Sequence, residues 1–373
     1  MSEPTSVVIY RYDASPFSVK VDNVLLLKNV PHHKVNVASL LPRPEITELL
    51  GLGYRRIPVL AIGNDVYCDT SLICSTLERR FPATKGYGTI FPPKKQGGSP
   101  DTTLIKIYTK SYVDNVVFPL APPLLPWEKF PEAFIKDRSS MMGPISVPAM
   151  ATARRRCLNL LSAHLALAEE QLRDGREWLF DTTSPSLADI ALHVVYSWVK
   201  SFRMPEAQAL FDEEKFSNVI KWLSRMNNHV DALRTQFDVP RIKGEEAARA
   251  ISVSPHEPYD IVGFDAADGA RLGFQMGDFV SIAPDDTARK FPAVGKLVGL
   301  SLEEFVIETK GKFGIIRCHF PRIGYSRFSA QGFPKQTINV CQSCATSSAQ
   351  CTCSCVQPVS LLTRPRDVFD VSL

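Results

Sequence analysis

The feature that most constrains the fold is a short apolar run followed by a hydroxyl residue and a proline. Val7-Val8-Ile9 is typical of a buried strand, and Ser15-Pro16 opens a helical pattern that continues to Leu27. Serine is a favoured N-cap, and proline is favoured at the first helical position. Ser15 is therefore expected at the positive end of a helix dipole, where an anion such as a thiolate is stabilised. The pair alone is equally compatible with a plain helix cap.

A second ordered set of signals follows further along the chain. Ile57-Pro58 precedes an apolar run, Val59–Ile62, which the turn residues Gly63-Asn64-Asp65 join to Val66–Cys68. Two short apolar runs around such a turn predict a β-hairpin. Asp69-Thr70 then opens a helical pattern that continues to Arg80 and stops before Pro82.

This order of elements resembles the N-terminal domain of the glutathione transferase superfamily, which has a thioredoxin-like α/β fold. Ser15-Pro16-Phe17 with Lys20-Val21 is similar to the Ser-Pro-Phe-x-x-Arg-Val of serine-type, tau-like transferases and to the Cys-Pro-Phe of omega-like ones. The sequence departs from the pattern at Lys20, where the family has Arg, and at Thr70, where Ser is commoner.

The resemblance implies a role for each matching residue. Ser15 would be the catalytic residue and donate a hydrogen bond to the glutathione thiolate, with Tyr10 and Tyr12 as alternative donors. Binding of glutathione as cofactor would involve five residues: Arg56, Ile57, Pro58, Asp69 and Thr70. Pro58 would be cis, Ile57 would offer its backbone to the cysteinyl part, and Asp69 and Thr70 would hold the γ-glutamyl end. Plain helix capping by Asp69 and Thr70, and a solvated Arg56, are the alternative readings.

Composition limits the classes of partner. The chain has 373 residues, 45% of them hydrophobic and 22% charged, and a formal net charge of +4. So small a charge gives no reason to expect nucleic acid or a membrane surface as partner. The N-terminus shows no secretory signal, and nine unevenly spaced cysteines fit a reducing compartment. The expected location is cytoplasmic.

The pattern divides the chain into three domains and a tail. Residues 1–84 are expected to form the thioredoxin-like domain and residues 101–237 an all-helical domain. In the latter, Ala151–Gln171 is amphipathic, and Ser186-x-x-Asp189 is a capping box at the head of an apolar helix. That box, after Trp178-Leu179, resembles the folding motif of the transferase C-terminal domain.

In the last third of the chain the spacing of apolar residues changes from a helical pattern to one typical of strands. Short apolar runs between turn residues predict a small β barrel or sandwich over residues 250–325, with strands that include Asp260–Phe264. Such an appended domain resembles that of some fungal transferase-like proteins. Residues 326–373 are expected to be a disordered, Cys-containing tail. Cys341-x-x-Cys344 and the later cysteines leave metal binding open, but no metal site is predicted.

These observations favour a glutathione S-transferase that activates the glutathione thiolate for addition to an apolar, electrophilic small molecule, or uses glutathione as a cofactor. A role in secondary metabolism is the narrower expectation, and a homodimer is a candidate assembly. The alternative is a non-catalytic interaction or structural module, because a fold does not fix a function.

Overall fold

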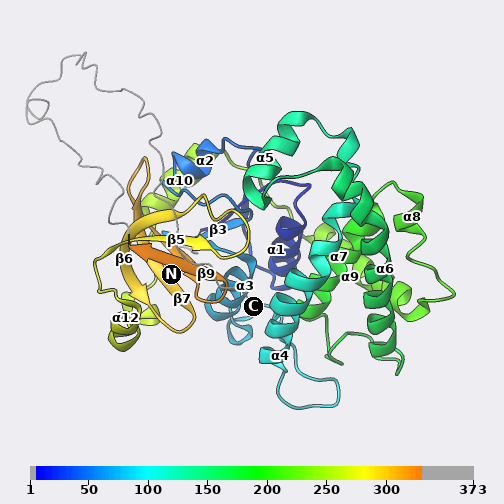
Figure 1. Cartoon of the computed structure of the whole chain (residues 1–373). Coiled ribbons are helices and arrows are strands. Elements are labelled where there is room, and N and C mark those ends of the chain that lie inside the picture. The colour runs from blue at the N-terminus through cyan, green and yellow to red at the C-terminus, as the bar shows by residue number, and fades with distance from the viewer. Residues whose placement is uncertain (1–5, 330–373) are drawn as a thin grey trace, which may run out of the picture. The chain divides into compact units, whose positions relative to one another are not determined.

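The computed structural model describes residues 6–329. In this part of the chain one continuous sheet of nine strands runs in the order β2-β1-β3-β4-β8-β7-β6-β5-β9 (Figure 1). The strands are β1 Val7–Arg11, β2 His33–Asn36, β3 Val59–Ile62, β4 Asp65–Cys68, β5 Phe279–Pro284, β6 Ala293–Leu300, β7 Glu304–Lys310, β8 Ile315–Pro321 and β9 Tyr325–Ser329.

Helices cover the sheet and form a separate helical part. The α-helices are α1 Pro16–Leu27, α2 Pro44–Thr47, α3 Thr70–Arg80, α4 Thr102–Ile107, α5 Glu132–Met142, α6 Val147–Gln171, α7 Leu187–Ser201, α8 Pro205–Gln208, α9 Ser217–Gln236, α10 Gly244–Val253, α11 Tyr259–Val262 and α12 Ala266–Leu272. A π-helix, Tyr108–Val117, continues α4, and short 3-10 turns follow it at Phe118–Leu120, Pro122–Leu124 and Trp127–Lys129; a further one is Ala83–Lys85. Among residues 6–329 no helix combines the length and the apolar character needed to cross a bilayer.

Strands β1 to β4 form the thioredoxin-like part that the sequence predicts. β1 is parallel to β2 and antiparallel to β3, and β3 pairs with β4 in the expected hairpin. Successive side chains point to opposite faces of a strand. Ile9 and Leu60 therefore pack on one face with α1, α3 and the helical part, whereas Val8 and Ala61 pack on the other with α10 and the later strands.

Local signals set the ends of the helices. Ser15 is the N-cap of α1, and its Oγ accepts a hydrogen bond from the Ser18 N–H at 3.2 Å. The capping box at the head of α7 is also formed, with Ser186 N–H and Oγ both donating to Asp189 Oδ2. The same buried carboxylate accepts from Leu179 N–H and the Trp222 indole, so it ties α7 to α9 and to the loop before α7. Both capping predictions are confirmed.

The later strands continue the first sheet instead of closing on themselves. β8 pairs with β4 in parallel, so β5 to β9 extend the thioredoxin-like sheet. β9 starts at Tyr325, soon after β8 ends at Pro321, yet it pairs with β5. These five strands must therefore curl strongly, but within residues 6–329 the ladder stays open. The prediction of a small β barrel or sandwich as a domain of its own is wrong in this respect, because β8 pairs with the edge of β4.

Two further predictions about this region need correction. Residues Asp260–Phe264 do not form a strand; Tyr259–Val262 is the helical turn α11. The predicted tail begins too early, because Ser326–Ser329 belong to β9. The rest of that tail, with the Cys341 to Cys355 cluster, lies outside the described residues.

A buried charge cluster lies where β8 meets β4. His319, fully buried, makes hydrogen bonds of 3.0 Å to Asp65 Oδ1 and 2.7 Å to Glu304 Oε2. Asp65 also accepts from Arg80 at 3.0 Å and lies 3.7 Å from Arg317. These side chains join the thioredoxin-like strands to the strands appended after them.

This cluster predicts a pH dependence of stability. Burial alone would lower the pKa of His319, but its hydrogen bonds to Asp65 and Glu304 outweigh burial and raise it. Since the folded pKa lies above the unfolded value of about 6.5, the stabilisation is complete below that pH and is lost as pH rises through the folded pKa. Thermal unfolding midpoints of the wild-type protein and of His319→Gln, recorded from below about pH 6.5 to well above it, measure this loss of stability. An equal fall in both midpoints would contradict the prediction.

Candidate functional site

The register of the sheet brings the three predicted site segments to one edge. Tyr10 pairs with Val59, and Val59 pairs with Cys68. The end of β1, the start of β3 and the end of β4 are therefore neighbours, about 5 Å apart from strand to strand. Ser15 follows the first, Ile57-Pro58 precedes the second, and Asp69-Thr70 follows the third.

Ser15 lies at the start of α1 with most of its surface buried, at 4% exposed. Its Oγ accepts from Ser18 N–H, and its own N–H donates to Tyr12 O at 3.2 Å. A hydroxyl carries one donor and two acceptor sites. Within residues 6–329 the Ser15 hydroxyl donates to no other group, so its proton is available to a ligand. Ser15 makes no hydrogen bond with the other predicted site residues.

The segment before β3 has the geometry that the resemblance implies for its proline. The Ile57–Pro58 peptide bond is cis, and Pro58 is buried. Ile57 is half-buried, and no hydrogen bond of residues 6–329 involves its backbone N–H or C=O. An unpaired donor and acceptor beside a strand can receive an extended peptide as an added strand.

Asp69 is the N-cap of α3 and has a positive φ of 74°, which is uncommon for a residue other than glycine. Its Oδ1 accepts from Ser71 N–H at 2.9 Å and Ser71 Oγ at 2.6 Å. Lys110 Nζ lies 3.3 and 3.2 Å from the two carboxylate oxygens, and the Tyr325 hydroxyl lies 3.3 Å from Oδ2. Thr70 is buried at the first position of α3.

The electrostatics of Asp69 follow from these neighbours. Burial alone would raise the pKa of its carboxyl group, but Lys110, the two hydrogen bonds from Ser71 and nearby Arg56 outweigh burial and lower it. Arg56 Nη1 lies 4.0 Å from Asp69 Oδ2. Asp69 is therefore ionised and already neutralised by side chains of its own chain.

Segments from later parts of the chain reach the same edge. Arg56 forms an ion pair with Asp286 and donates to Thr287 O at 2.7 Å. Ala288 N–H, beside them, donates to Met141 O at 2.7 Å. The segment between β5 and β6 thus meets α5 next to Arg56, so the helical part and the appended strands both border the site (Figure 1).

Aromatic rings lie beside the start of α1. Phe17 and Phe118 have ring centroids 4.5 Å apart, and Phe118 stacks on Trp198 at 5.6 Å. All three side chains are partly exposed, so they offer an apolar surface next to Ser15. Tyr108 and Tyr112, on the π-helix before Phe118, do not join this surface. Tyr108 packs against Phe180 and Tyr112 against His164 in the helical part.

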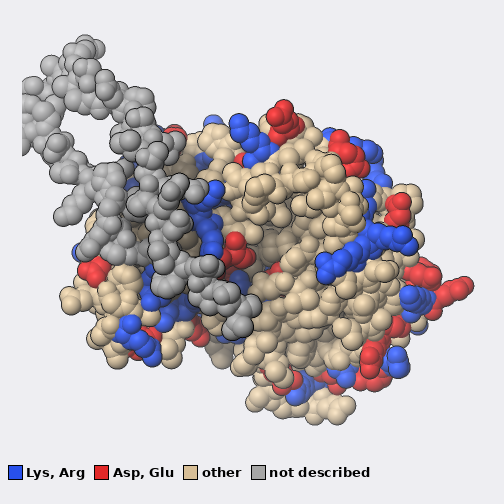
Figure 2. Space-filling view, viewed as in Figure 1, with Lys and Arg blue, Asp and Glu red and all other residues tan. Residues whose placement is uncertain are grey.

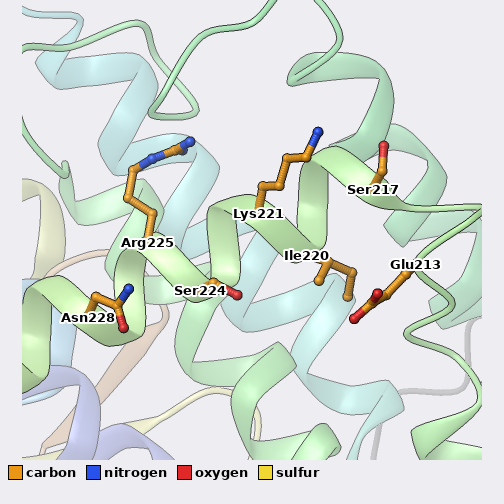
Figure 3. A pocket seen from close by; sticks show the side chains of 7 residues that line it. All are labelled: Glu213, Ser217, Ile220, Lys221, Ser224, Arg225 and Asn228. Atoms are coloured by element: carbon orange, nitrogen blue, oxygen red, sulfur yellow. The ribbon is translucent and has the colours of Figure 1, made fainter.

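Two hollows in the described part of the chain contain none of the predicted site residues. One, of about 500 Å³, lies along α9, and Figure 3 shows its lining side chains on successive turns of that helix and on the loop before it. It is lined by Glu213, Ser217, Ile220, Lys221, Ser224, Arg225 and Asn228. The other, of about 440 Å³, lies between α3, α4 and the start of β7. The hollow along α9 is bounded by one helix and the loop before it, so catalytic groups do not converge there. The edge of the sheet is therefore the better candidate for the functional site.

Charge on the surface is mixed. Figure 2 shows Lys and Arg interspersed with Asp and Glu on the visible face, in keeping with the small formal net charge of +4. Within residues 6–329 no three His, Cys, Asp or Glu side chains are grouped as metal ligands.

Sequence reasoning missed the residues that reach this edge from a distance. Lys110 lies in the π-helix, a form that often occurs at functional sites. Tyr325 starts a strand that the sequence assigned to the boundary of the tail, and its hydroxyl is 2.7 Å from that of Tyr54. No sequence motif around Lys110 or Tyr325 points to the site, because both reach Asp69 from positions far away in the sequence.

Comparison with known proteins identifies the first part of the chain. A family model described as "Glutathione S-transferase, N-terminal domain" matches residues 9–85, and one described as "Domain of unknown function (DUF7962)" matches residues 116–235. Residues 9–85 therefore match the family of glutathione S-transferase N-terminal domains. A search of curated proteins found no match.

Solved structures show how far the fold recurs. A GST-like protein from Pseudomonas syringae covers 87% of this chain and 99% of its own, at 24% identity and a TM-score of 0.65. That share extends beyond the thioredoxin-like and helical parts, so the fold that recurs includes appended strands. The tau-class glutathione S-transferase from mango, Mangifera indica, covers 66% of this chain and 99% of its own, at 15% identity and a TM-score of 0.46. Glutathione transferase Omega 3C from Trametes versicolor covers 64% and 92%, at 16% identity and a TM-score of 0.46.

Proposed function

We propose that the protein binds glutathione at this sheet edge and activates its thiolate for addition to an apolar, electrophilic small molecule. The main support is that two groups lie at one edge of the sheet without partners among residues 6–329: the Ser15 hydroxyl proton, which has no acceptor, and the backbone of Ile57, beside Pro58. Neither group alone would be specific. Together they suit a peptide that carries a thiol.

Thiolate stabilisation is the chemical step that Ser15 would serve. A cysteine thiol has a pKa of about 8.5, so only a few per cent is ionised at neutral pH. The Ser15 hydroxyl would donate to the sulfur, and the start of α1 would add its favourable field. Serine is not consumed in this role, whereas a cysteine would form a mixed disulfide. Covalent attack by Ser15 is not expected, because in the described part of the chain no histidine is hydrogen-bonded to it as a base.

The other parts of glutathione would bind to the segments next to Ser15 at the sheet edge. Its cysteinyl backbone would pair with Ile57, as an added strand does. Its γ-glutamyl end would reach the start of α3 at Asp69 and Thr70, and Arg56 would stand beside it. The apolar substrate would lie against Phe17, Phe118 and Trp198, which adjoin Ser15.

Glutathione binding is the first test of this proposal. The wild-type protein should be retained on immobilised glutathione, and a ligand present at about a hundred times its Kd should stabilise the fold by about 2.7 kcal/mol in thermal unfolding. Asp69→Asn should lose retention while keeping the fold, because asparagine tolerates a positive φ. Asp231→Asn, on the exposed face of α9, is the matched control. No retention and no stabilisation of the wild-type protein would favour a non-catalytic module instead.

A further inference from the structure

The carboxylate of Asp69 has no free acceptor site for a ligand. A carboxylate accepts about four hydrogen bonds. Oδ1 already accepts from the backbone and hydroxyl of Ser71, and both oxygens lie within 3.3 Å of Lys110 Nζ. The Tyr325 hydroxyl donates to Oδ2 at 3.3 Å. A ligand ammonium group can therefore reach Asp69 only if one of these donors leaves.

Lys110 is the donor best able to leave. Its side chain is 23% exposed and flexible, whereas Ser71 is held by the helix start and Tyr325 is 4% exposed. Asp114, one turn further along the same π-helix, forms its close ion pair with Lys20 at 2.8 Å and attracts Lys110 only at longer range. Released from Asp69, the Lys110 ammonium would still lie beside any ligand bound there.

We propose that the Asp69–Lys110 ion pair exchanges with the α-amino-acid group of the ligand, so that Lys110 becomes the residue that selects the ligand's carboxylate. This inference rests on the proposed function. The ligand ammonium takes the place of the Lys110 ammonium on Asp69, and Lys110 pairs with the ligand carboxylate. Opposite charges are matched before and after the exchange, so a ligand with both groups on one carbon gains most.

Tyr325 keeps the carboxylate in position during the exchange. Its hydroxyl contacts both Asp69 Oδ2 and the Tyr54 hydroxyl, and all three side chains are at most 9% exposed. When Lys110 leaves, the bonds from Ser71 and Tyr325 remain and orient Asp69 toward the incoming ammonium. The appended strands thereby contribute to the ligand site through Tyr325.

A comparison of two ligands on several variants tests the exchange. Calorimetry would measure the Kd of glutathione and of the analogue whose γ-glutamyl group lacks its α-carboxylate. For the wild-type protein, loss of the carboxylate should weaken binding by about tenfold or more, because a hydrogen bond between charged groups is lost. For Lys110→Met the two ligands should differ by less than about threefold. Lys110→Arg should keep a preference for the carboxylate.

Lys106→Met is the matched control, since Lys106 is one turn away on α4 with its ammonium over the Phe91 ring. It should behave like the wild-type protein. The exchange would be overturned if removing the ligand's α-carboxylate weakened binding equally in the wild-type protein and in Lys110→Met, with thermal unfolding showing both to be folded. Glutathione binding itself would then still stand. Failure of the wild-type protein to bind either ligand would overturn the proposed function, and the exchange with it.

Discussion

Replacing Ser15 with alanine is expected to lower the rate of glutathione conjugation by roughly ten- to a thousand-fold. Removing one hydrogen-bond donor to a developing anion has an effect of this order, and the field of α1 remains to limit the loss. Glutathione affinity should change little, because Ile57, Asp69 and Thr70 are untouched. Steady-state kinetics with a general electrophile, together with calorimetry of glutathione binding, separate the two effects.

Two further variants sharpen this prediction. Ser15→Cys should gain thiol transfer through a mixed disulfide, since a thiolate at a helix N-terminus is nucleophilic. Ser18→Ala is the control: Ser18 Oγ is buried and makes no hydrogen bond in the described part of the chain, so its loss should leave the rate unchanged. A full rate in Ser15→Ala would show that another group holds the thiolate. The sequence offers Tyr12 or Ser18 next, and Ser18 is fully buried, so Tyr12 would be the candidate.

Replacing Asp65 with asparagine is expected to destabilise the fold by about 3–5 kcal/mol, the usual effect of removing one partner from a buried charge cluster. Asp65 is fully buried and faces Arg80, His319 and Arg317. Asparagine keeps the shape but removes the carboxylate that the three cations share, so His319 keeps only Glu304 and Arg80 only Glu257. Against a typical domain stability of 5–15 kcal/mol, the loss is large. Chemical denaturation followed by circular dichroism measures it.

Asp231→Asn again supplies the comparison, since the Asp231–Arg234 pair is exposed on both sides and exposed pairs contribute little. Its unfolding midpoint should stay close to that of the wild-type protein. If Asp65→Asn were as stable as this control, the charge cluster at the β4–β8 junction would not hold the appended strands to the thioredoxin-like sheet.

Short-range chemistry explains what the sequence predicts well. Ser15-Pro16 caps α1 and Asp69 caps α3, and both ends follow from bonds to residues two or three positions away. The Gly63-Asn64 turn is also indicated by its own residues, since Gly63 has a φ of 63°. The capping box at Ser186 and Asp189 is equally local. Such signals are complete within one turn of chain.

Long-range pairing explains what the sequence misses. Nothing near Val66 in the sequence indicates that its strand pairs with Cys318 of β8. Helix α10 begins at Gly244, between the predicted helical domain and the predicted β domain, and its Ala247, Ala248 and Ile251 are buried against the sheet. Alanines give a weak hydrophobic period, so the amphipathic face went unrecognised.

The residues of the candidate site also fall into these two groups, those indicated by local sequence and those brought together only by the fold. Ser15, Ile57, Pro58, Asp69 and Thr70 could be chosen from the sequence, because they match short motifs of the glutathione transferase family. Lys110 and Tyr325 could not, since only the fold brings the π-helix and β9 to Asp69. The predicted role of Arg56 is modified in the same way, because Asp286 and Thr287 already bind Nη2 of its guanidinium.

The most direct test of the account is the ionisation of bound glutathione. Ultraviolet absorbance of the thiolate, followed against pH with the protein saturated, gives the pKa of the bound thiol. The wild-type protein should lower that pKa below the free value of about 8.5, and Ser15→Ala should return it most of the way. A bound thiol that ionises as it does in water, or one equally ionised in both proteins, would contradict the claim that Ser15 activates glutathione.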